Sequence, residues 1–387
     1  MYRAMNDSAT HLLLADLIAF DTVSRNSNLA LIDYVQRYLA RYGVDSQLLP
    51  DASSQKASLL AAIGPQDKPG IVLSGHTDVV PVDGQQWQSA PFCLQQRDGR
   101  FYGRGAADMK GWLAAVLALV PQLTAQPLRA PVWIAFSYDE EVGCKGVPGL
   151  LEHLATQPCL PAACIVGEPT EMRPILGHKG KIAIRCTVTG HASHSAYTPL
   201  GVNAIEYAVR IIQRLMEQAE QLRMEQNLAF DPPFSTLQTG VIHGGEALNI
   251  VPAHCEFDFE IRTLPGVDTQ PIIESLQTWC REKLLPEMRI ISPACDIQFS
   301  RLSQYPGLQT QQAAMIDDIL ALLPAPETLS TVAFGTEGGL FQQYGIPTLV
   351  CGPGAMAQGH KPDEFVSVAQ LAECDDFLLR LCRWLRA

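Results

Sequence analysis

Short runs of apolar residues alternate with helical patterns along much of the chain. Four runs, at residues 71–74, 132–136, 163–166 and 346–351, have the length and composition of buried β-strands. Helical patterns follow Asp108, span about 311–323 and begin again at Val368. Strands that alternate with helices predict a largely parallel sheet covered on both faces, the arrangement of an α/β domain.

The pattern changes after about residue 180. Residues 182–188 alternate between apolar and polar positions, a long helical pattern runs from 203 towards 226, and residues 255–262 alternate strictly. Strict alternation predicts an antiparallel sheet with one face open to solvent. The α/β pattern returns after Pro293. We therefore predict a discontinuous α/β domain, residues 1–180 and 295–387, with a smaller α+β domain inserted at 181–294.

Composition narrows the classes of function. The 387 residues are 47% hydrophobic and only 18% charged, which excludes global disorder. The net charge of -12 provides no basic surface to neutralise phosphates, so we expect no nucleic-acid partner. No uncharged segment approaches the roughly 20 residues that span a bilayer, so we expect no membrane function.

The cysteines and the N-terminal region indicate a cytoplasmic protein. Eleven cysteines, an odd number, are scattered without a C-x-x-C pair, which argues against a disulfide framework and against a thiolate zinc site. The apolar run at 11–18 is interrupted by Asp16 and lacks a basic region and a small-residue cleavage site. It therefore predicts a core-facing helix and not a signal peptide.

Histidine and acidic side chains follow the predicted strands where each strand ends. Taken alone, a histidine in such a position is more often an ordinary hydrogen-bonded residue. Ligand sites in open α/β sheets lie outside the carboxyl ends of the strands, so we expect these side chains to converge. Histidines and carboxylates without thiolates are the ligand set of a hydrolytic zinc, cobalt or manganese centre. The residues are His76, Asp78, Asp139, Glu140, Glu141, Glu168 and His360, and Asp108 joins them at the start of a predicted helix.

Five segments carry a resemblance to a known family. They are SGHTDVVP at 74–81, YGRGAADMKG at 102–111, YDEEVG at 138–143, GEPT at 167–170 and GHKPDE at 359–364. Together they resemble the signatures of the dinuclear zinc aminoacylase and carboxypeptidase family. The likeness covers essentially the whole chain, in the family's order. It implies a metal-dependent amidohydrolase built from a catalytic domain and an inserted dimerisation lid.

The resemblance implies a centre of two divalent metal ions. Zn²⁺ is the expected ion, and Co²⁺ and Mn²⁺ are the alternatives. It assigns His76, Asp108 and Glu168 to one ion, and Asp108, Glu141 and His360 to the other, with Asp108 bridging. Each ion then has three protein ligands and an open position, as catalytic zinc requires. The resemblance also implies a cis peptide bond after Asp108.

Two further acids of the catalytic domain receive roles from the resemblance. Glu140 corresponds to the general base, a carboxylate beside the metals but not bound to them. The alternative without a catalytic role is that Glu140 caps a helix or is an acid on the surface. Asp78 corresponds to the carboxylate that fixes the imidazole tautomer of His76.

The inserted domain supplies the next group of candidates. His194 matches the histidine that crosses from the neighbouring subunit of a homodimer to polarise the scissile carbonyl. His191 lies three residues earlier, and spacing alone does not choose between the two.

Asn249 and Arg262 match substrate-binding positions, and an arginine fork suits a carboxylate. An ion pair of Arg262 with Glu260 or Asp258 is the ordinary alternative. Backbone N–H groups for the same carboxylate or for an oxyanion are expected at Gly335, Thr336 and Gly354.

The resemblance also implies a small N-acyl amino acid as substrate. N2-acetyl-L-ornithine, cleaved to ornithine and acetate as in arginine biosynthesis, is the leading interpretation. A succinyl-diaminopimelate desuccinylase, another amidohydrolase or a dipeptidase is the alternative within the family. A non-catalytic metal-binding or amino-acid-binding protein is the alternative of another class. Nucleotide binding is disfavoured, because Gly103 and Gly105 lack the third spaced glycine of a dinucleotide fingerprint.

Overall fold

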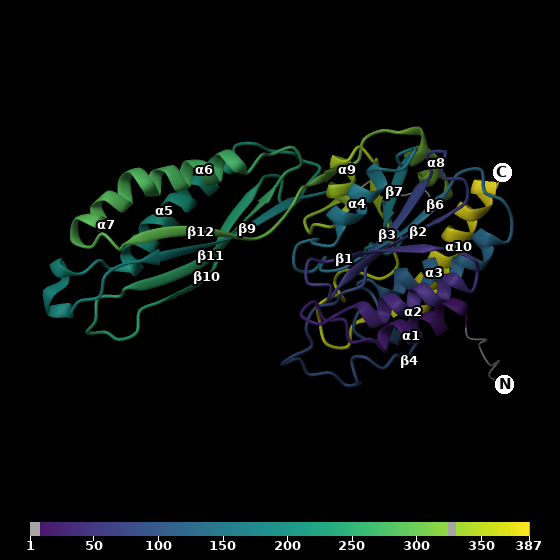
Figure 1. Cartoon of the computed structure of the whole chain (residues 1–387), viewed down its shortest axis with the longest axis horizontal. Helices are drawn as coiled ribbons and strands as arrows, with labels where there is room; N and C mark the ends of the chain where they lie inside the picture. The colour runs from purple at the N-terminus through teal and green to yellow at the C-terminus, as the bar shows by residue number, and fades with distance from the viewer. Residues whose placement is uncertain (1–7, 324–329, 387) are drawn as a thin grey trace. The chain divides into compact units, whose positions relative to one another are not determined.

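The computed structural model describes residues 8–323 and 330–386, and the chain divides into two compact units (Figure 1). The main unit contains residues up to 177, 308–331 and 336 onwards. The inserted unit contains residues 178–307 and 332–335. This division confirms the predicted fold class, a discontinuous α/β domain with an α+β insertion.

A mixed sheet with a parallel centre forms the main unit. Its strands are ordered β1-β2-β6-β3-β7-β15-β8-β13, and β14 pairs with β8. Strands β6, β3, β7 and β15 are parallel, whereas β1 and β2 add antiparallel pairs at one side. The bounds are β1 Ser46–Pro50, β2 Ala57–Ile63, β3 Ile71–His76, β6 Val132–Ser137, β7 Ala163–Val166, β8 Ile175–His178, β13 Leu308–Gln309, β14 Ser330–Val332 and β15 Thr348–Val350.

Helices cover both faces of this sheet (Figure 1). On one face, α3 packs on β3 and is itself covered by α1 and α10, while α4 and α9 pack on the other face. The bounds are α1 Ala9–Ile18, α2 Leu29–Ala40, α3 Lys110–Thr124, α4 Val147–Ala155, α8 Ala314–Leu322, α9 Gly338–Gln343 and α10 Val368–Arg386. A small sheet, ordered β16-β5-β4, is formed by β4 Gln95–Arg97, β5 Arg100–Tyr102 and β16 Phe365–Ser367.

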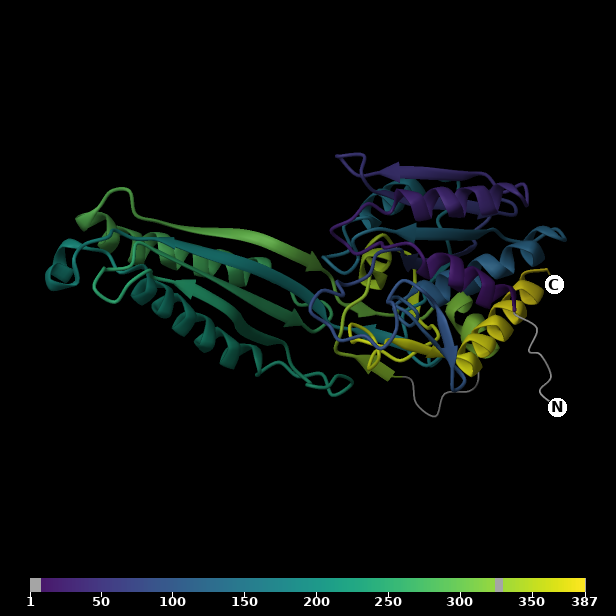
Figure 2. The same ribbon diagram turned by 90° about the horizontal axis from the view of Figure 1, so that it is seen from below.

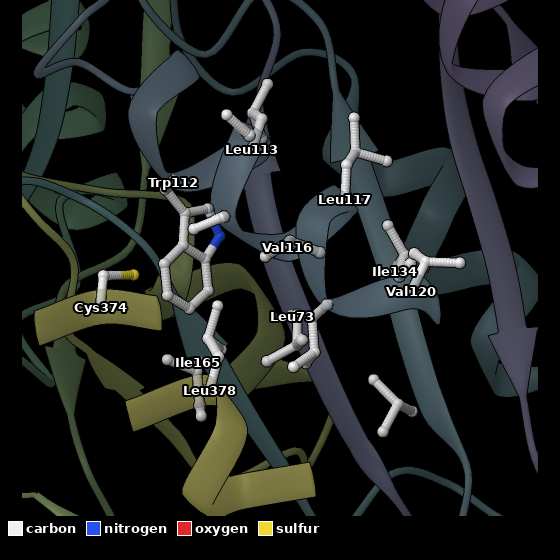
Figure 3. Close-up of a cluster of buried hydrophobic side chains, with 14 of the residues drawn as sticks. Leu73, Trp112, Leu113, Val116, Leu117, Val120, Ile134, Ile165, Cys374 and Leu378 are labelled. Atoms are coloured by element: carbon white, nitrogen blue, oxygen red, sulfur yellow. The ribbon is translucent and has the colours of Figure 1, made fainter. Parts of the chain in front are cut away.

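The largest core cluster lies around α3 (Figure 3). Trp112, Val116 and Val120 of this helix are fully buried among side chains from the strands and from α10. Leu73 of β3 is one of those side chains, whereas its neighbour Val72 is buried outside this cluster. Successive strand residues point to opposite faces, so a sheet covered on both sides requires unbroken apolar runs of this kind.

A four-stranded antiparallel sheet forms the inserted unit, in the order β10-β11-β9-β12. Its bounds are β9 Gly180–Thr189, β10 Thr236–Gly244, β11 His254–Thr263 and β12 Asp296–Tyr305. Helices α5 Ala204–Leu222, α6 Gln270–Trp279 and α7 Leu285–Ile291 accompany it, with a 3₁₀ segment at Ser195–Leu200 and a π-helical turn at Cys280–Leu284. Apolar residues of α5 and α6 pack with one face of the sheet, on which both helices lie (Figure 2).

The inserted unit extends further than the boundary predicted at residue 294. Strand β12 pairs with β9 from Asp296 to Tyr305 and so completes the antiparallel sheet. The unit therefore includes residues 295–307, which we had predicted to belong to the α/β domain. The prediction stopped at a change of pattern, but backbone pairing of a fourth strand decides where the unit ends.

The structure describes the state of the cysteines and the character of the helices. All eleven cysteines are free thiols. Of the helices within 8–323 and 330–386, none combines the length and the apolar character needed to cross a membrane.

Candidate metal centre and active site

The parallel strands bring the predicted ligands to one edge of the main sheet. His76 is the last residue of β3 and pairs in register with Ser137 of β6, so Asp139 to Glu141 follow on the adjacent strand. Val166 of β7 pairs with both Ser74 and Val350, which places the segments that begin at Gly167 and Cys351 beside them. The convergence follows from the parallel topology, because all four strands end at the same edge.

His76, Asp108 and Glu168 form the first of two ligand clusters. The Nε2 atom of His76 lies 3.0 Å from Oδ1 of Asp108 and 3.6 Å from Oε1 of Glu168. All three side chains are buried. Their ligand atoms lie within 4.8 Å of one another, close enough for one ion to bind all three.

Asp108, Glu141 and His360 form the second cluster. The Nε2 atom of His360 lies 3.2 Å from Oδ2 of Asp108 and 3.1 Å from Oε2 of Glu141. Asp108 thus directs one carboxylate oxygen to each histidine. The His360 side chain is 52% exposed, so the second cluster is the more open of the two.

The electrostatics of the centre favour bound cations. Burial and the charge of Asp108 raise the pKa of Glu168 well above its ordinary value and that of Glu141 to about 7. Hydrogen bonds to Asp108 and Glu141 raise the pKa of His360 to about 10. Raised pKa values of two buried acids that lie near Asp108, and of a histidine beside two carboxylates, indicate a site with a deficit of positive charge. Within the described ranges, Oε1 of Glu141 is also buried without a hydrogen-bond partner, so the donor set fits two divalent ions.

Glu364 anchors the loop that carries Asp108. Its Oε1 atom accepts hydrogen bonds from the backbone nitrogens of Ala107 and Asp108, at 2.9 and 3.0 Å. Its Oε2 atom accepts from Gly105 at 3.1 Å and from Arg104 Nη1 at 2.6 Å. The peptide bond after Asp108 is cis, as the resemblance implied. Glu364 and Arg104 lie in two of the sequence motifs, but the sequence predicted no role for either.

Asp78 differs from its predicted role. The Nδ1 atom of His76 is hydrogen-bonded to the backbone carbonyl of Asp78, at 2.9 Å, and lies 3.6 Å from its carboxylate. The carboxylate instead accepts hydrogen bonds from the backbone nitrogens of Glu140 and Glu141 and from the hydroxyl of Ser24. The carbonyl therefore selects the His76 tautomer, while the side chain fixes the turn after β6.

Glu140 lies beside both clusters. Burial raises its pKa well above the ordinary value, and the acids Glu141 and Asp108 add to this shift. The thiol of Cys144 lies 3.5 Å from its Oε1 atom. The preceding residue, Asp139, adopts a positive φ of 53° and pairs with Lys56. This conformation is uncommon outside glycine but is found for aspartate, and here it turns the chain at the end of β6.

Glu337, a buried acid for which the sequence predicted no role, lies below the strand ends. Glu337 is fully buried and accepts hydrogen bonds from Ser74 of β3, at 2.5 Å, and from Ser137 of β6, at 2.7 Å. It thus links the start of α9 to the two strands that lead to His76 and Glu140. The segment FGTE at 334–337 contains this acid, but nothing in the sequence indicates that its partners are serines of two strands.

His194 and Asn249 lie together in the inserted unit. The backbone nitrogen of Ser195 donates to the carbonyl of Asn249 at 3.0 Å, and His194 forms a β-bridge with Ile250. The Nδ1 atom of His194 accepts from the backbone nitrogen of Ala196, so the neutral ring carries its proton on Nε2. His191 forms a backbone bridge with Val202. His194 thus has the tautomer that can donate to a carbonyl oxygen.

Arg262 is paired with a carboxylate of its own strand. Its Nε atom lies 3.1 Å from Oε1 of Glu260, whereas Asp258 pairs with Arg185 at 2.8 Å. The ion pair that we considered as an alternative is therefore present and is made with Glu260. The Arg262 side chain is 32% exposed, so it is also accessible.

The three residues predicted to offer backbone N–H groups, Gly335, Thr336 and Gly354, lie in different surroundings. The N–H of Gly354 donates to the side chain of Gln370 at 3.2 Å, so it is not the donor that we predicted. The hydroxyl of the buried Thr336 accepts from the backbone nitrogen of Gly338 at 3.0 Å. Gly335 belongs to the inserted unit and packs against Tyr305. Spacing could locate these loops but not the partners that already use their polar groups.

A family model matches residues 72–384 of this chain, the span that contains all five ligands. It describes the peptidase family M20/M25/M40. The chain belongs to this family. As a member it is a metal-dependent hydrolase, which confirms the class of enzyme expected from the sequence.

Curated relatives from this family match the chain over nearly its whole length. An acetylornithine deacetylase from Pasteurella multocida is 35% identical and the match covers 98% of this chain and 96% of that protein. An acetylornithine deacetylase from Myxococcus xanthus is 36% identical, with 95% of each covered. An M20 family metallo-carboxypeptidase from Sulfolobus solfataricus has a similar fold, with a TM-score of 0.79 at 17% identity over 98% of this chain and 99% of that one.

Proposed function

We propose that this M20 hydrolase cleaves the amide bond of N2-acetyl-L-ornithine and releases ornithine and acetate. The observation that carries the proposal is the pair of ligand clusters that share Asp108, with Glu140 beside them and outside both. The similarity to acetylornithine deacetylases along nearly the whole chain supports the choice of substrate.

We assign the metal ligands as the sequence predicted. His76, Asp108 and Glu168 hold one ion, and Asp108, Glu141 and His360 hold the other. Zn²⁺ is the ion that we propose, with Co²⁺ or Mn²⁺ as substitutes, because the donors are imidazole and carboxylate without thiolate. When bound, the ions supply Lewis acidity to the amide carbonyl and to water.

Glu140 is the general base of the proposed reaction. It takes a proton from the attacking water and delivers it to the nitrogen that leaves as the amine of ornithine. Its place beside the two clusters and outside both suits this role, because the carboxyl must accept and release a proton without binding an ion. Asp78 holds the backbone of Glu140 and so fixes where this base lies.

The inserted unit recognises the substrate. The Arg262 guanidinium binds the α-carboxylate through its two-pronged geometry, and Asn249 supplies an amide near His194. The Nε2–H of His194 donates to the carbonyl oxygen of the scissile amide and stabilises the charge that develops there. The backbone at Gly335 and Thr336 remains a proposed contact, whereas we leave out Gly354.

We propose that the protein is a homodimer and that His194 acts in the active site of the partner subunit. Strand β10 is an outer strand of its sheet, and Val241 and Ile242 on it are exposed. The nearby Leu248 is also fully exposed. An exposed apolar edge strand is suited to pairing with a second copy. A cytoplasmic location agrees with the eleven free thiols.

A panel of substrates tests the proposed reaction. The metal-loaded protein is assayed with N2-acetylornithine, other N-acetyl amino acids, N-succinyl-diaminopimelate and dipeptides. We expect the highest kcat/KM for N2-acetylornithine. A higher value for the succinyl compound or for a dipeptide would reassign the substrate within the family. A Glu140→Gln variant serves as the control for contaminating hydrolases.

A further inference from the structure

Three side chains form a row across the sheet of the inserted unit. Arg262 of β11 pairs in register with Lys181 of β9, and Lys181 pairs with Tyr305 of β12. Directly paired residues of an antiparallel sheet point to the same face. Ile182 and Ile261, the neighbours of Lys181 and Arg262, are buried, so this row lies on the face opposite to the core.

Arg262 has two partners in this row. Glu260 lies 3.1 Å from its Nε atom, and the guanidinium is also hydrogen-bonded to the hydroxyl of Tyr305. Lys181 shares Glu260, at 3.5 Å. Two cations and one carboxylate leave the group with one uncompensated positive charge. The carboxylate of an amino-acid substrate would balance that charge.

The ring of Tyr305 is held by a second contact. It lies so close to Gly335 that a Cβ atom at this position would be 1.9 Å from the ring carbon Cε2 and 2.6 Å from the hydroxyl oxygen. Only glycine allows this approach without a shift of the ring. Tyr305 therefore joins two of the predicted substrate contacts, Arg262 and Gly335, which are distant in the sequence.

We propose that Tyr305 is a positioning residue for the carboxylate-binding arginine, an inference that rests on the role proposed for Arg262. When the substrate carboxylate replaces Glu260 on the guanidinium, the Tyr305 hydroxyl is the contact that remains and fixes the orientation of the fork. Without this hydroxyl, Glu260 is the remaining partner and competes with the substrate. The loss then falls on carboxylate binding and not on the chemical step.

Tyr305→Phe tests the proposal, because it removes the hydroxyl and keeps the ring against Gly335. We expect KM for N2-acetylornithine to rise about 5- to 10-fold, within the net range of one hydrogen bond, with kcat within about twofold. The kcat/KM for N-acetyl-1,4-diaminobutane, which lacks the carboxylate, is expected to stay unchanged. Tyr42→Phe, at an exposed tyrosine of the main unit, is the matched control.

A double-mutant cycle separates this inference from the proposed function. In an Arg262→Lys background, Tyr305→Phe is expected to change KM less than twofold, since the group it positions is gone. Arg262→Lys is expected to lower kcat/KM selectively for the substrate that carries the carboxylate. If it does so and Tyr305→Phe does not, the role of Tyr305 is wrong and the role of Arg262 is retained. An equal loss with both substrates for Tyr305→Phe would also overturn its positioning role. If Arg262→Lys lowers kcat/KM equally for both substrates or for neither, the proposal that Arg262 binds the substrate carboxylate is wrong.

Discussion

The carboxylate oxygen Oδ1 of Asp78 lies 3.0 Å from the backbone nitrogen of Glu140. The other oxygen of the same carboxylate lies 3.3 Å from the backbone nitrogen of Glu141. One side chain thus fixes two consecutive residues that we assign to different tasks, proton transfer and metal binding. Its backbone carbonyl meanwhile holds the imidazole of His76.

Asp78→Asn is therefore expected to impair turnover more than metal binding. The amide keeps one acceptor oxygen but presents an NH₂ group to the second backbone N–H, while the carbonyl contact to His76 persists. We expect kcat to fall about 10-fold, in line with the loss of one charge-assisted hydrogen bond, at unchanged metal content. Atomic absorption and steady-state kinetics check this. Ser24→Ala, which removes a third partner of the carboxylate, is the control, and metal loss in Asp78→Asn would restore the originally predicted role.

Glu140→Gln separates the base from the ligands. The amide cannot accept a proton at neutral pH, so we expect kcat to fall by about 10²- to 10⁴-fold while two ions per chain are retained. Glu141→Gln, one residue further on, is the matched comparison and is expected to lose metal as well as activity. Parallel loss of metal and activity in Glu140→Gln would make Glu140 a ligand.

Chelation is expected to abolish activity reversibly. The ligand side chains lie at the ends of strands whose core is formed independently by apolar packing around α3. The metal-free protein should therefore keep its far-ultraviolet circular dichroism spectrum, and added Zn²⁺, Co²⁺ or Mn²⁺ should restore turnover. Full activity in a preparation shown to be free of metal would contradict the assignment of the two clusters.

A mixture of two inactive variants tests the partner-supplied histidine. Chains with Glu140→Ala are combined with chains with His194→Ala under conditions of subunit exchange. Half of the dimers are then mixed and each has one intact site, so about a quarter of the wild-type activity should return. Native mass spectrometry verifies the exchange. Without any recovery, His194 acts in its own chain, and the same experiment is then repeated with His191→Ala.

Asp375 is expected to make stability depend on pH. Burial raises its pKa from 3.8 to about 6, and the hydroxyl of Thr10 donates to it at 2.7 Å. Because the folded state holds this proton more tightly than the unfolded chain, the free energy of unfolding falls as the pH rises from about 4 to 6. Partial exposure reduces the loss to about 1 kcal/mol.

Asp375→Asn keeps an acceptor for Thr10 and removes this proton. We expect its Tm at pH 7.5 to exceed that of the wild type by about 2 °C, with no difference at pH 4. Thermal unfolding at both pH values measures this. Asp376→Asn, at the exposed neighbour, is the control, and equal effects of both variants would show a general charge effect instead.

The sequence predicted those strands whose own residues show a clear pattern of apolar and polar positions. The buried strand at 71–74 and the alternating strand at 255–262 are present as β3 Ile71–His76 and β11 His254–Thr263. Strand β12 was missed because its exposed and buried positions follow no regular alternation, and it is defined by pairing with β9. Pairing between distant segments is not encoded in the periodicity of either one.

The candidate site was also predicted only in part. The motifs identified which of the acids and histidines lie together, since parallel strands must deliver their ends to one edge. They did not reveal that the Asp78 carboxylate serves the backbone of Glu140, nor that the Gly354 N–H is already used by Gln370. Such contacts depend on side-chain orientation in three dimensions, which residue type and spacing do not specify.

The interval of 284 residues between His76 and His360 has a consequence for biosynthesis. During translation the first cluster has all its side chains once Glu168 has left the ribosome, whereas the second waits for His360. Glu364, which anchors the backbone of Asp108, emerges later still. The inserted unit can pair all its strands in the meantime. A nascent chain therefore lacks a ligand of the second cluster until His360 has been made, however much of the chain has already folded.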